Sequence, residues 1–138
     1  MKEKRVIKFR ALREHTAVME YGFYFADSKG HYIVDDEGVE SIINPDTLGQ
    51  FTGLLDKNKK EIYEGDIVDC ITNCITINHI RYPHRGVIRF INSYFAIEVP
   101  EFYREDGGLG YTPMMYNHEF EVIGDIYTTP ELLKSLKE

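Results

Sequence analysis

The sequence predicts a mainly β protein of the α+β class, built from antiparallel strands, with an SH3-like small barrel in its C-terminal half and a short C-terminal helix. Ten Tyr and eight Phe residues, together with many Ile and Val residues, favour strands. Turn-forming residues divide the chain into short segments, which is typical of small closed or sandwiched sheets. A chain of 138 residues that is 43% hydrophobic can bury a core without a metal or a disulfide.

The first half of the chain predicts strands joined by polar turns. Residues 6–12 alternate between apolar and basic side chains, as in a half-buried strand. The apolar face of this strand holds Ile7, Phe9 and Ala11. Residues 21–26 and 31–34 predict a hairpin, because turn formers lie between them. A short strand is expected at residues 50–52.

The second half predicts consecutive strands that surround a core. Gly65 and Asp66 predict a tight turn, with the Asp side chain bonding the backbone, before a buried strand that begins at Ile67. Residues 86–91 predict the next strand, and Asn92 and Ser93 its turn. Two later strands are expected to have apolar faces made by Phe95, Ile97 and Val99 and by Phe120, Val122, Gly124 and Ile126.

The last residues predict a short helix that docks on the sheet. Thr129 suits an N-cap, Pro130 suits the first helical position, and Glu131 suits the positive end of the helix dipole. An apolar stripe follows at Leu132, Leu133 and Leu136. A helix this short is marginal alone, so we expect its leucines to pack on a neighbouring strand.

Length and charge indicate one compact unit with two subdomains. We expect an N-terminal β subdomain at residues 1–60 and a barrel-like subdomain with the terminal helix at residues 61–138. The net charge is −7, yet residues 1–13 carry six basic residues against one acid. Such asymmetry indicates either a partner or two parts of the chain that attract each other.

Three places in the chain carry a family resemblance. They are residues 7–11, then 51–54, 56–58 and 61–68, and finally 120–127 with 130–133. In this order they resemble the YopX family of small phage and prophage proteins. The resemblance implies a mostly β protein encoded in phage genomes, and it supplies no catalytic residue. The motif residues, which we expect to be structural, are Thr52, Gly53, Tyr63, Gly65, Asp66, Gly124 and Asp125.

One position departs from the family pattern. Lys59 stands where such proteins usually have Gly after Asn58. An Asn-Gly pair favours a tight type I′ turn, because both residues tolerate positive φ. Lys59 therefore predicts a wider loop.

Cysteine and histidine spacing raises the question of a metal. Cys70, Cys74, His79 and His84 are the residue types that bind zinc. The surrounding sequence favours a strand, in which four residues separate Cα atoms by about 13 Å, too far for one zinc. We therefore expect structural cysteines, no bound metal and no cofactor.

A basic, aromatic segment offers a nucleic-acid surface. Residues 70–97 contain no acid. The candidate contact residues are Arg81, Tyr82, Arg85, Arg89 and Tyr94. Arginine binds phosphate and stacks on bases, as aromatic side chains also do. The alternative is a solvated hairpin whose aromatics lie in the core and whose arginines pair with nearby acids.

No catalytic set emerges from the sequence. The acid pairs Asp35–Asp36 and Glu64–Asp66 lie in turn-forming sequence, and no nucleophile or phosphate-binding motif is present. Two cysteines without a secretion signal or an apolar span predict the host cytoplasm and no membrane contact. We expect a non-enzymatic phage or prophage accessory protein that binds another protein or itself. The alternative is a nucleic-acid-binding small barrel.

Overall fold

The computed structural model describes residues 4–70, 76–77, 80–81, 84–100, 110–114 and 119–133. The chain divides into two units, Met1–Gly53 and Leu54–Glu138, which we describe separately. The expected division at residues 60 and 61 within one compact unit stays a prediction. Described strands are antiparallel to their partners, which confirms a mainly β fold.

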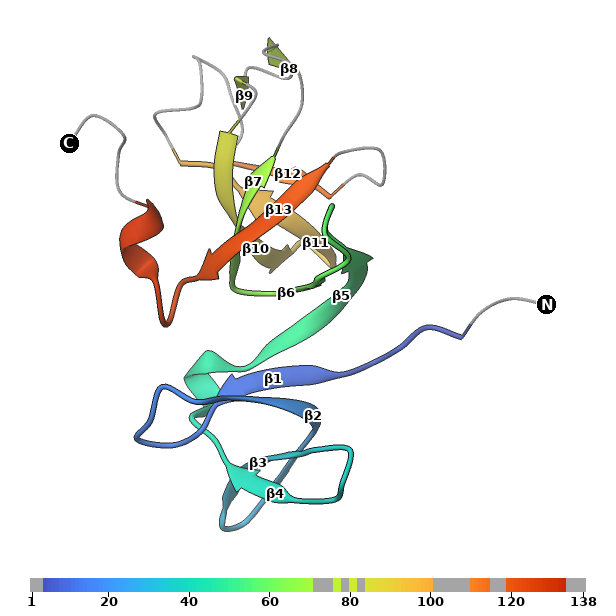
Figure 1. The fold of residues 1–138 in the computed structure, drawn as a ribbon, viewed down its shortest axis with the longest axis vertical. Helices are drawn as coiled ribbons and strands as arrows, with labels where there is room; N and C mark the ends of the chain where they lie inside the picture. The colour runs from blue at the N-terminus through green and yellow to red at the C-terminus, as the bar shows by residue number, and fades with distance from the viewer. Residues whose placement is uncertain are drawn as a thin grey trace. The chain divides into compact units, whose positions relative to one another are not determined.

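Unit 1 is a meander of strands with one strand returning beside the first (Figure 1). Its strands are β1 (Phe9–Leu12), β2 (Met19–Asp27), β3 (Gly30–Val34), β4 (Glu40–Ile42) and β5 (Gly49–Leu55), with the 3-10 turn η1 (Pro45–Thr47) before β5. β5 continues beyond Gly53 and is followed in the six-stranded sheet by β6 (Glu61–Tyr63), in the order β4-β3-β2-β1-β5-β6.

The predicted hairpin of unit 1 is present as β2 and β3. Their register places Asp27 opposite Gly30 and Phe25 opposite Tyr32. An Asp27 carboxylate oxygen accepts hydrogen bonds from the backbone N–H groups of Lys29 and Gly30, at 2.8 and 3.1 Å, and so fixes the turn. The core on one side of the sheet consists of Ala11, Ile33 and Ile43, flanked by Phe9, Tyr24 and Leu48.

The first strand begins later than its sequence pattern predicts. Alternation extends back to residue 6, yet β1 begins at Phe9. Ile7 was expected on the buried face but is 52% exposed, because strand pairing with β2 ends at Phe9 and Gly22. Residues 4–8 thus lie before the first strand, where Lys8 alone is bonded to the sheet, through its carbonyl and the N–H of Phe51 on β5.

Unit 2 contains a five-stranded antiparallel sheet. Its strands are β7 (Asp66–Cys70), β10 (His84–Ile91), β11 (Tyr94–Glu98), β12 (Tyr111–Pro113) and β13 (Phe120–Asp125), in the order β12-β11-β10-β7-β13. The backbones of β8 (Thr76–Ile77) and β9 (Ile80–Arg81) form a small separate ladder. The turn η3 (Pro130–Leu133) follows β13.

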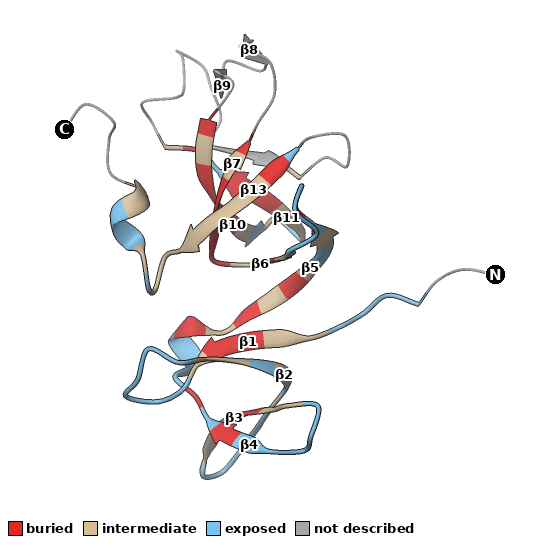
Figure 2. Ribbon diagram, viewed as in Figure 1, coloured by how far each residue is buried: buried red, intermediate tan, exposed pale blue. Residues whose placement is uncertain are grey.

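Residues of these strands, together with Ile62 of β6 and Val99 after β11, fill the core of unit 2. The core consists of Ile62, Val68, Cys70, Ile88, Ile97, Val99 and Phe120. In Figure 2 the strands β7 and β10 are buried along most of their length, as central strands should be. The hairpin between β10 and β11 turns at Asn92 and Ser93, whose φ angles of 52° and 73° suit a type I′ turn.

The last strand departs from its predicted alternation. Val122 pairs with Val68, but Gly124 pairs with Ile67, so a bulge lies between them. A bulge inserts one residue and reverses which face the following residues take. Phe120 and Val122 therefore join the core, whereas Gly124 lies on the other face of the sheet, beneath Thr129 and Leu132.

The predicted C-terminal helix is not present in the described residues, so that prediction is wrong. The described residues after β13 form only the 3-10 turn Pro130–Leu133, in which the Leu132 N–H donates to the Thr129 carbonyl. Thr129 does not act as a helix N-cap, because its hydroxyl bonds the backbone of Asp125 instead. The Leu132 carbonyl accepts a hydrogen bond from Arg85, which holds the turn against β10. Leu136 lies outside the described residues.

Candidate interaction surfaces

Asp56 secures the loop that carries much of the family pattern. Its Oδ1 atom accepts from the N–H groups of Asn58 and Lys60, and its Oδ2 atom accepts from the N–H of Val122. Burial alone would raise the pKa of Asp56, but these three backbone donors and the Lys60 charge outweigh it, so the pKa lies below its ordinary value. Asp56 therefore joins two distant segments of unit 2 as an ionised acceptor.

Lys59 occupies the position that the family pattern gives to Gly. Its φ of 65° lies in the left-handed region, and its N–H donates to the Asp56 carbonyl. The loop between β5 and β6 runs through a turn followed by one left-handed residue, and it is wider than a two-residue turn. The backbone thus keeps a conformation that suits Gly, although the side chain has changed.

Two further motif aspartates also bond the backbone. The Asp66 carboxylate accepts the N–H of Tyr63 at 2.7 Å, and Gly65 before it has a φ of 93°. Asp125 accepts the N–H groups of Tyr127 and Thr128. Thr52 and Gly53 lie in β5, and Gly124 lies in β13. These contacts give the motif aspartates a role in holding turns.

The acid pairs considered for catalysis are divided between turns. In the first pair, Asp35 accepts the N–H groups of Glu37 and Val39 at 2.9 Å each, while Asp36 is exposed. In the second pair, Asp66 is buried and engaged with Tyr63. The chemistry visible at Asp35 and Asp66 is turn stabilisation.

The four zinc candidates are only partly described. Cys70 and His84 are both buried and lie directly opposite each other on β7 and β10. Burial raises the pKa of the Cys70 thiol to about 12. Cys74 and His79 lie outside the described residues, and within the described ones no group of three or more potential ligands occurs. Zinc absence stays a prediction, for which elemental analysis of untagged protein is the measurement.

The predicted nucleic-acid residues share one strand face where they are described. Arg85 and Arg89 alternate on β10, and Tyr94 lies opposite Ile91 on that face. Arg85 pairs with Asp69 at 2.7 Å, and Arg89 pairs with Glu98 at 3.3 Å. Only the backbone of Arg81 is described, and Tyr82 lies outside the described residues. Both described arginines therefore already have a carboxylate partner.

A different surface stands out in unit 1. Phe25 stacks on Tyr32 with ring centroids 4.7 Å apart, and Tyr32 lies opposite Ile42 on β4. Phe23 lies on the same face of β2, opposite Val34. We call Phe23, Phe25, Tyr32, Val34 and Ile42 the aromatic face. Phe23 is 66% exposed and Ile42 is 53% exposed, so apolar surface lies open to solvent here.

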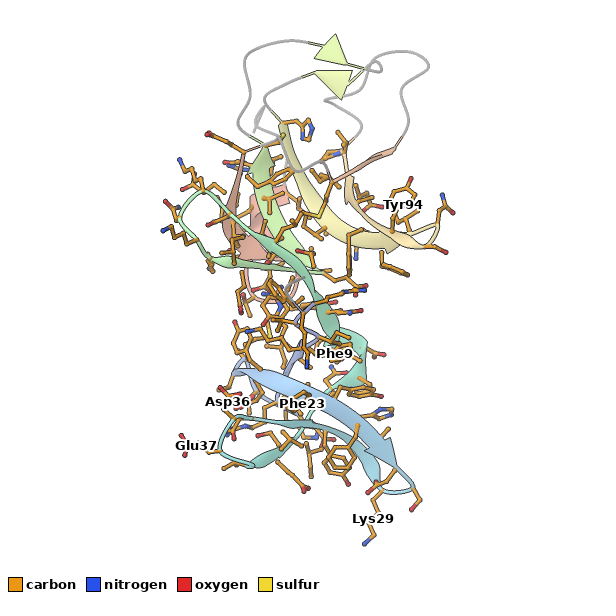
Figure 3. The ribbon with its side chains drawn as sticks, turned by 90° about the vertical axis from the view of Figure 1, so that its right-hand side faces the viewer. Phe9, Phe23, Lys29, Asp36, Glu37 and Tyr94 are labelled. Carbon is orange, nitrogen blue, oxygen red and sulfur yellow. The ribbon has the colours of Figure 1, made fainter. Side chains whose placement is uncertain are left out.

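Acids border the aromatic face. Partial burial raises the pKa of Tyr32, and so do the carboxylate of Asp27, which accepts its hydroxyl proton in a hydrogen bond, and the charge of Glu40. Next to the face, a hollow of about 240 Å³ is lined by Lys8, Tyr21, Gly22, Asp35, Asp36 and Glu37. Figure 3 shows Asp36 and Glu37 at the turn after β3. The surface is therefore apolar with an acidic rim.

Sequence reasoning missed this face, although a signal was present. Aromatic residues occupy positions 21, 23, 24 and 25, so both faces of the predicted strand are aromatic. Tyr24 points toward the core beside Ile33. One face of a small sheet is enough to make a core, so the second aromatic face must meet solvent or a partner.

No helix among the described residues is long and apolar enough to cross a membrane.

Comparisons with known proteins agree on one family. Residues 8–134 match the family model described as YopX protein. The fold is similar to the crystal structure of protein EF1440 from Enterococcus faecalis, at 25% identity over 95% of this chain and 100% of that chain, with a TM-score of 0.56. It is also similar to protein yopX from Bacillus subtilis, at 20% identity over 92% and 98% of the chains, with a TM-score of 0.54. Among curated proteins none matches. The chain belongs to the YopX family.

Proposed function

We propose that this chain is a non-enzymatic accessory protein of a phage or prophage that acts in the host cytoplasm by binding protein through the aromatic face. The observation that carries the proposal is the exposure of Phe23, Phe25 and Ile42 on one side of a single sheet. Contiguous exposed apolar surface with a polar rim is typical of protein-binding sites. Aromatic residues also contribute most to the energy of such interfaces.

The distribution of exposed apolar side chains supports the choice of unit 1. In the described part of the chain, eight of the ten large hydrophobic residues that are exposed lie between residues 6 and 42. Only Leu55 and Phe90 belong to unit 2. The turn roles of Asp35, Asp56, Asp66 and Asp125 support a non-enzymatic reading, because a backbone-bonded carboxylate is not placed to transfer a proton.

A site-specific cross-linking experiment tests the proposal. A photoreactive phenylalanine analogue is placed at Phe23 in the full chain, and the matched control carries it at Phe90, which is 54% exposed in unit 2. We expect irradiation in host cells to give a covalent adduct with protein at position 23 and not at position 90. Equal or absent labelling at the two positions would overturn protein binding through the aromatic face.

Nucleic-acid binding is the second candidate. The observation in its favour is that Arg85, Arg89 and Tyr94 lie on one strand face, within a stretch that contains no acid. Pairing of these arginines with Asp69 and Glu98 weighs against it. Phosphate contacts would make binding fall steeply with salt. A gel-shift titration of single- and double-stranded DNA and RNA at low and moderate salt tests it, and retardation lost on Arg85→Gln with Arg89→Gln would favour this candidate.

We also propose that the five-stranded sheet of unit 2 is an SH3-like small barrel. The strand order supports it: β7, β10, β11 and β12 follow as neighbours, and β13 returns beside β7. In such a barrel the two outer strands, β12 and β13, curve toward each other. Nuclear Overhauser contacts between their amide protons would establish closure, and their absence would leave an open sheet.

A further inference from the structure

An edge of β2 has no strand beside it in the described structure. β2 pairs with β1 only from Met19 to Gly22, and it pairs with β3 on its opposite side from Phe23 to Asp27. Along residues 23–27, the edge on the β1 side therefore carries no paired strand among the described residues. An open edge beside exposed aromatic side chains is a template for adding an extended segment.

The segment before β1 has the properties of such an added strand. Residues 4–8, which we call the arm, are extended and precede β1 directly, and in Figure 1 they lead away from β2, β3 and β4. Val6 is 55% exposed and Ile7 is 52% exposed, so the arm leaves its apolar side chains uncovered. Lys4 and Arg5 are exposed as well. The arm thus offers both apolar and basic groups.

The register of β1 matches the arm to the open edge. Phe9 lies opposite Gly22, and each step back along the arm advances one residue along β2. The register is that of one chain, and an arm from either copy that continued it would place Val6 opposite Phe25, Ile7 opposite Tyr24, and Lys4 opposite Asp27. Cross-strand apolar and opposite-charge pairs are the pairs that stabilise a sheet.

The net charges of the first 13 residues and of the rest of unit 1 are also opposite in sign. Residues 14–53 carry eight acids and Lys29 as their only Lys or Arg residue, whereas the first 13 residues carry a charge of +5. Asp27 and Glu40 adjoin the aromatic face, and Asp36 and Glu37 line the hollow beside it. A basic arm and an acidic rim are electrostatically complementary.

We propose that the arm of one copy of this chain adds as a strand to residues 23–27 on β2 of a second copy, and that the exchange is reciprocal. In its own chain the base of the arm is bound to β5, because the Lys8 carbonyl accepts the N–H of Phe51 and the Lys8 ammonium lies 5.4 Å from the Phe51 ring, while Lys8 also lines the hollow with Asp35 and Asp36. Two copies related by a twofold axis fill both open edges. This inference rests on the proposed function and names its partner as a second copy.

Disulfide trapping between two differently substituted full-length chains tests the register. One chain carries Val6→Cys and the other carries Phe25→Cys. Both chains also carry Cys70→Ser and Cys74→Ser, which remove the native thiols. A chain with only these two serine substitutions is the control for folding. Mixing the chains under mild oxidation should give a disulfide-linked heterodimer. The matched control replaces Phe25→Cys with Phe90→Cys and should give none. Equal trapping in the two mixtures, or no disulfide-linked heterodimer in either, would overturn the exchange.

Light scattering across a concentration series tests the charges and separates this inference from the proposed function. The wild-type chain should be a dimer, and Lys4→Glu with Arg5→Glu should weaken self-association by about tenfold or more. Lys57→Glu with Lys59→Glu, a matched reversal in unit 2, should leave it unchanged. A wild-type monomer at every concentration would overturn the exchange. If the monomer still cross-linked to a different protein through position 23, protein binding would stand without the exchange.

Discussion

At the scale of single residues, backbone hydrogen bonds explain why this sequence uses so many acids in its turns. Asp27, Asp35, Asp56 and Asp125 each accept at least two backbone N–H groups within a few residues of themselves. Each such bond satisfies a donor that a turn would otherwise leave to solvent. The acidic charge of the chain is therefore partly a consequence of how it turns.

Lys59 provides the most local prediction. A left-handed conformation costs a non-glycine residue roughly 1 kcal/mol, and Lys59 has a φ of 65°. Lys59→Gly should therefore raise the free energy of unfolding by up to about 1 kcal/mol. Lys57→Gly, in the same loop but without positive φ, should lower it slightly. Chemical denaturation measures both, and a destabilising Lys59→Gly would show that the left-handed turn is not the cause of the strain.

Asp56 predicts a pH-dependent contribution to stability. Asp56→Asn should lower the free energy of unfolding by about 1–3 kcal/mol at neutral pH, because it removes a charged acceptor of three backbone bonds. The folded pKa of Asp56 lies below its ordinary value of 3.8, so its contribution is complete above that value and is lost as pH falls through the folded pKa. The difference between the two proteins should shrink in that range.

The control for Asp56 is the same change at an exposed acid. Asp46→Asn should leave stability within about 0.5 kcal/mol of wild type at every pH, as surface substitutions usually do. Denaturation midpoints from neutral pH down to strong acid supply the measurement. A gap between Asp56→Asn and wild type that stays constant into acid would contradict the assigned role of the charge.

We expect the thiol of Cys70 to be unreactive in the folded protein. Burial raises its pKa to about 12, and the residue lies in the core of unit 2. In a Cys74→Ser variant, Cys70 is the only thiol, so its reaction with Ellman's reagent at mildly alkaline pH should be limited by opening of the protein. In denaturant the same thiol should react at once. Rapid reaction of the native protein would place Cys70 at the surface.

At the scale of elements, the sequence predicts what depends on neighbouring residues and misses what depends on distant ones. The turns at residues 27–30 and 92–93 carry their own signals and are present. The bulge before Gly124 has no local signal, because it depends on pairing with β7. Thr129 and Pro130 favour the start of a helix locally. Distant contacts prevail over that preference, because the Thr129 hydroxyl bonds Asp125 and the Leu132 carbonyl accepts a hydrogen bond from Arg85.

The same division applies to the candidate surfaces. The basic residues near Arg85, and the presence of acids that could pair with them, can be read from the sequence, whereas the pairing of Arg85 with Asp69 follows from strand register. The aromatic face can be recognised only when it is known that Tyr24 points toward the core, because Phe23 and Phe25 then face solvent. Periodicity alone cannot choose which of two aromatic faces becomes the core.

The packing of η3 against β13 can be tested at Gly124. A side chain there would meet the Thr129 hydroxyl, and its Cβ would lie 2.7 Å from Leu132 Cδ1, so Gly124→Val should lift η3 from the sheet. We expect a loss of roughly 1–3 kcal/mol. Leu132→Ala removes one obstacle, so the double variant should lose less than the sum of the single losses. Thermal melts measure the cycle, and fully additive losses would mean that Leu132 does not cover Gly124.

At the scale of the whole molecule, the two units differ in what they leave exposed. Among its described large hydrophobic residues, unit 2 leaves only Leu55 and Phe90 exposed, and it pairs Arg85 and Arg89 with acids. Unit 1 leaves the aromatic face and the arm open, with opposite charges on the two. Surfaces of this kind are costly in water unless a partner covers them. We therefore propose that recognition belongs to unit 1.

Amide hydrogen exchange of the full chain, compared between dilute and concentrated solution, tests this central claim most directly. It reports on both candidate surfaces in one sample, because association slows exchange only where backbone becomes covered. We expect slower exchange at high concentration in the arm and along β2 from Phe23 to Asp27, and unchanged exchange in β10 and β11. Slowing confined to β10 and β11, or no slowing at any concentration, would contradict it.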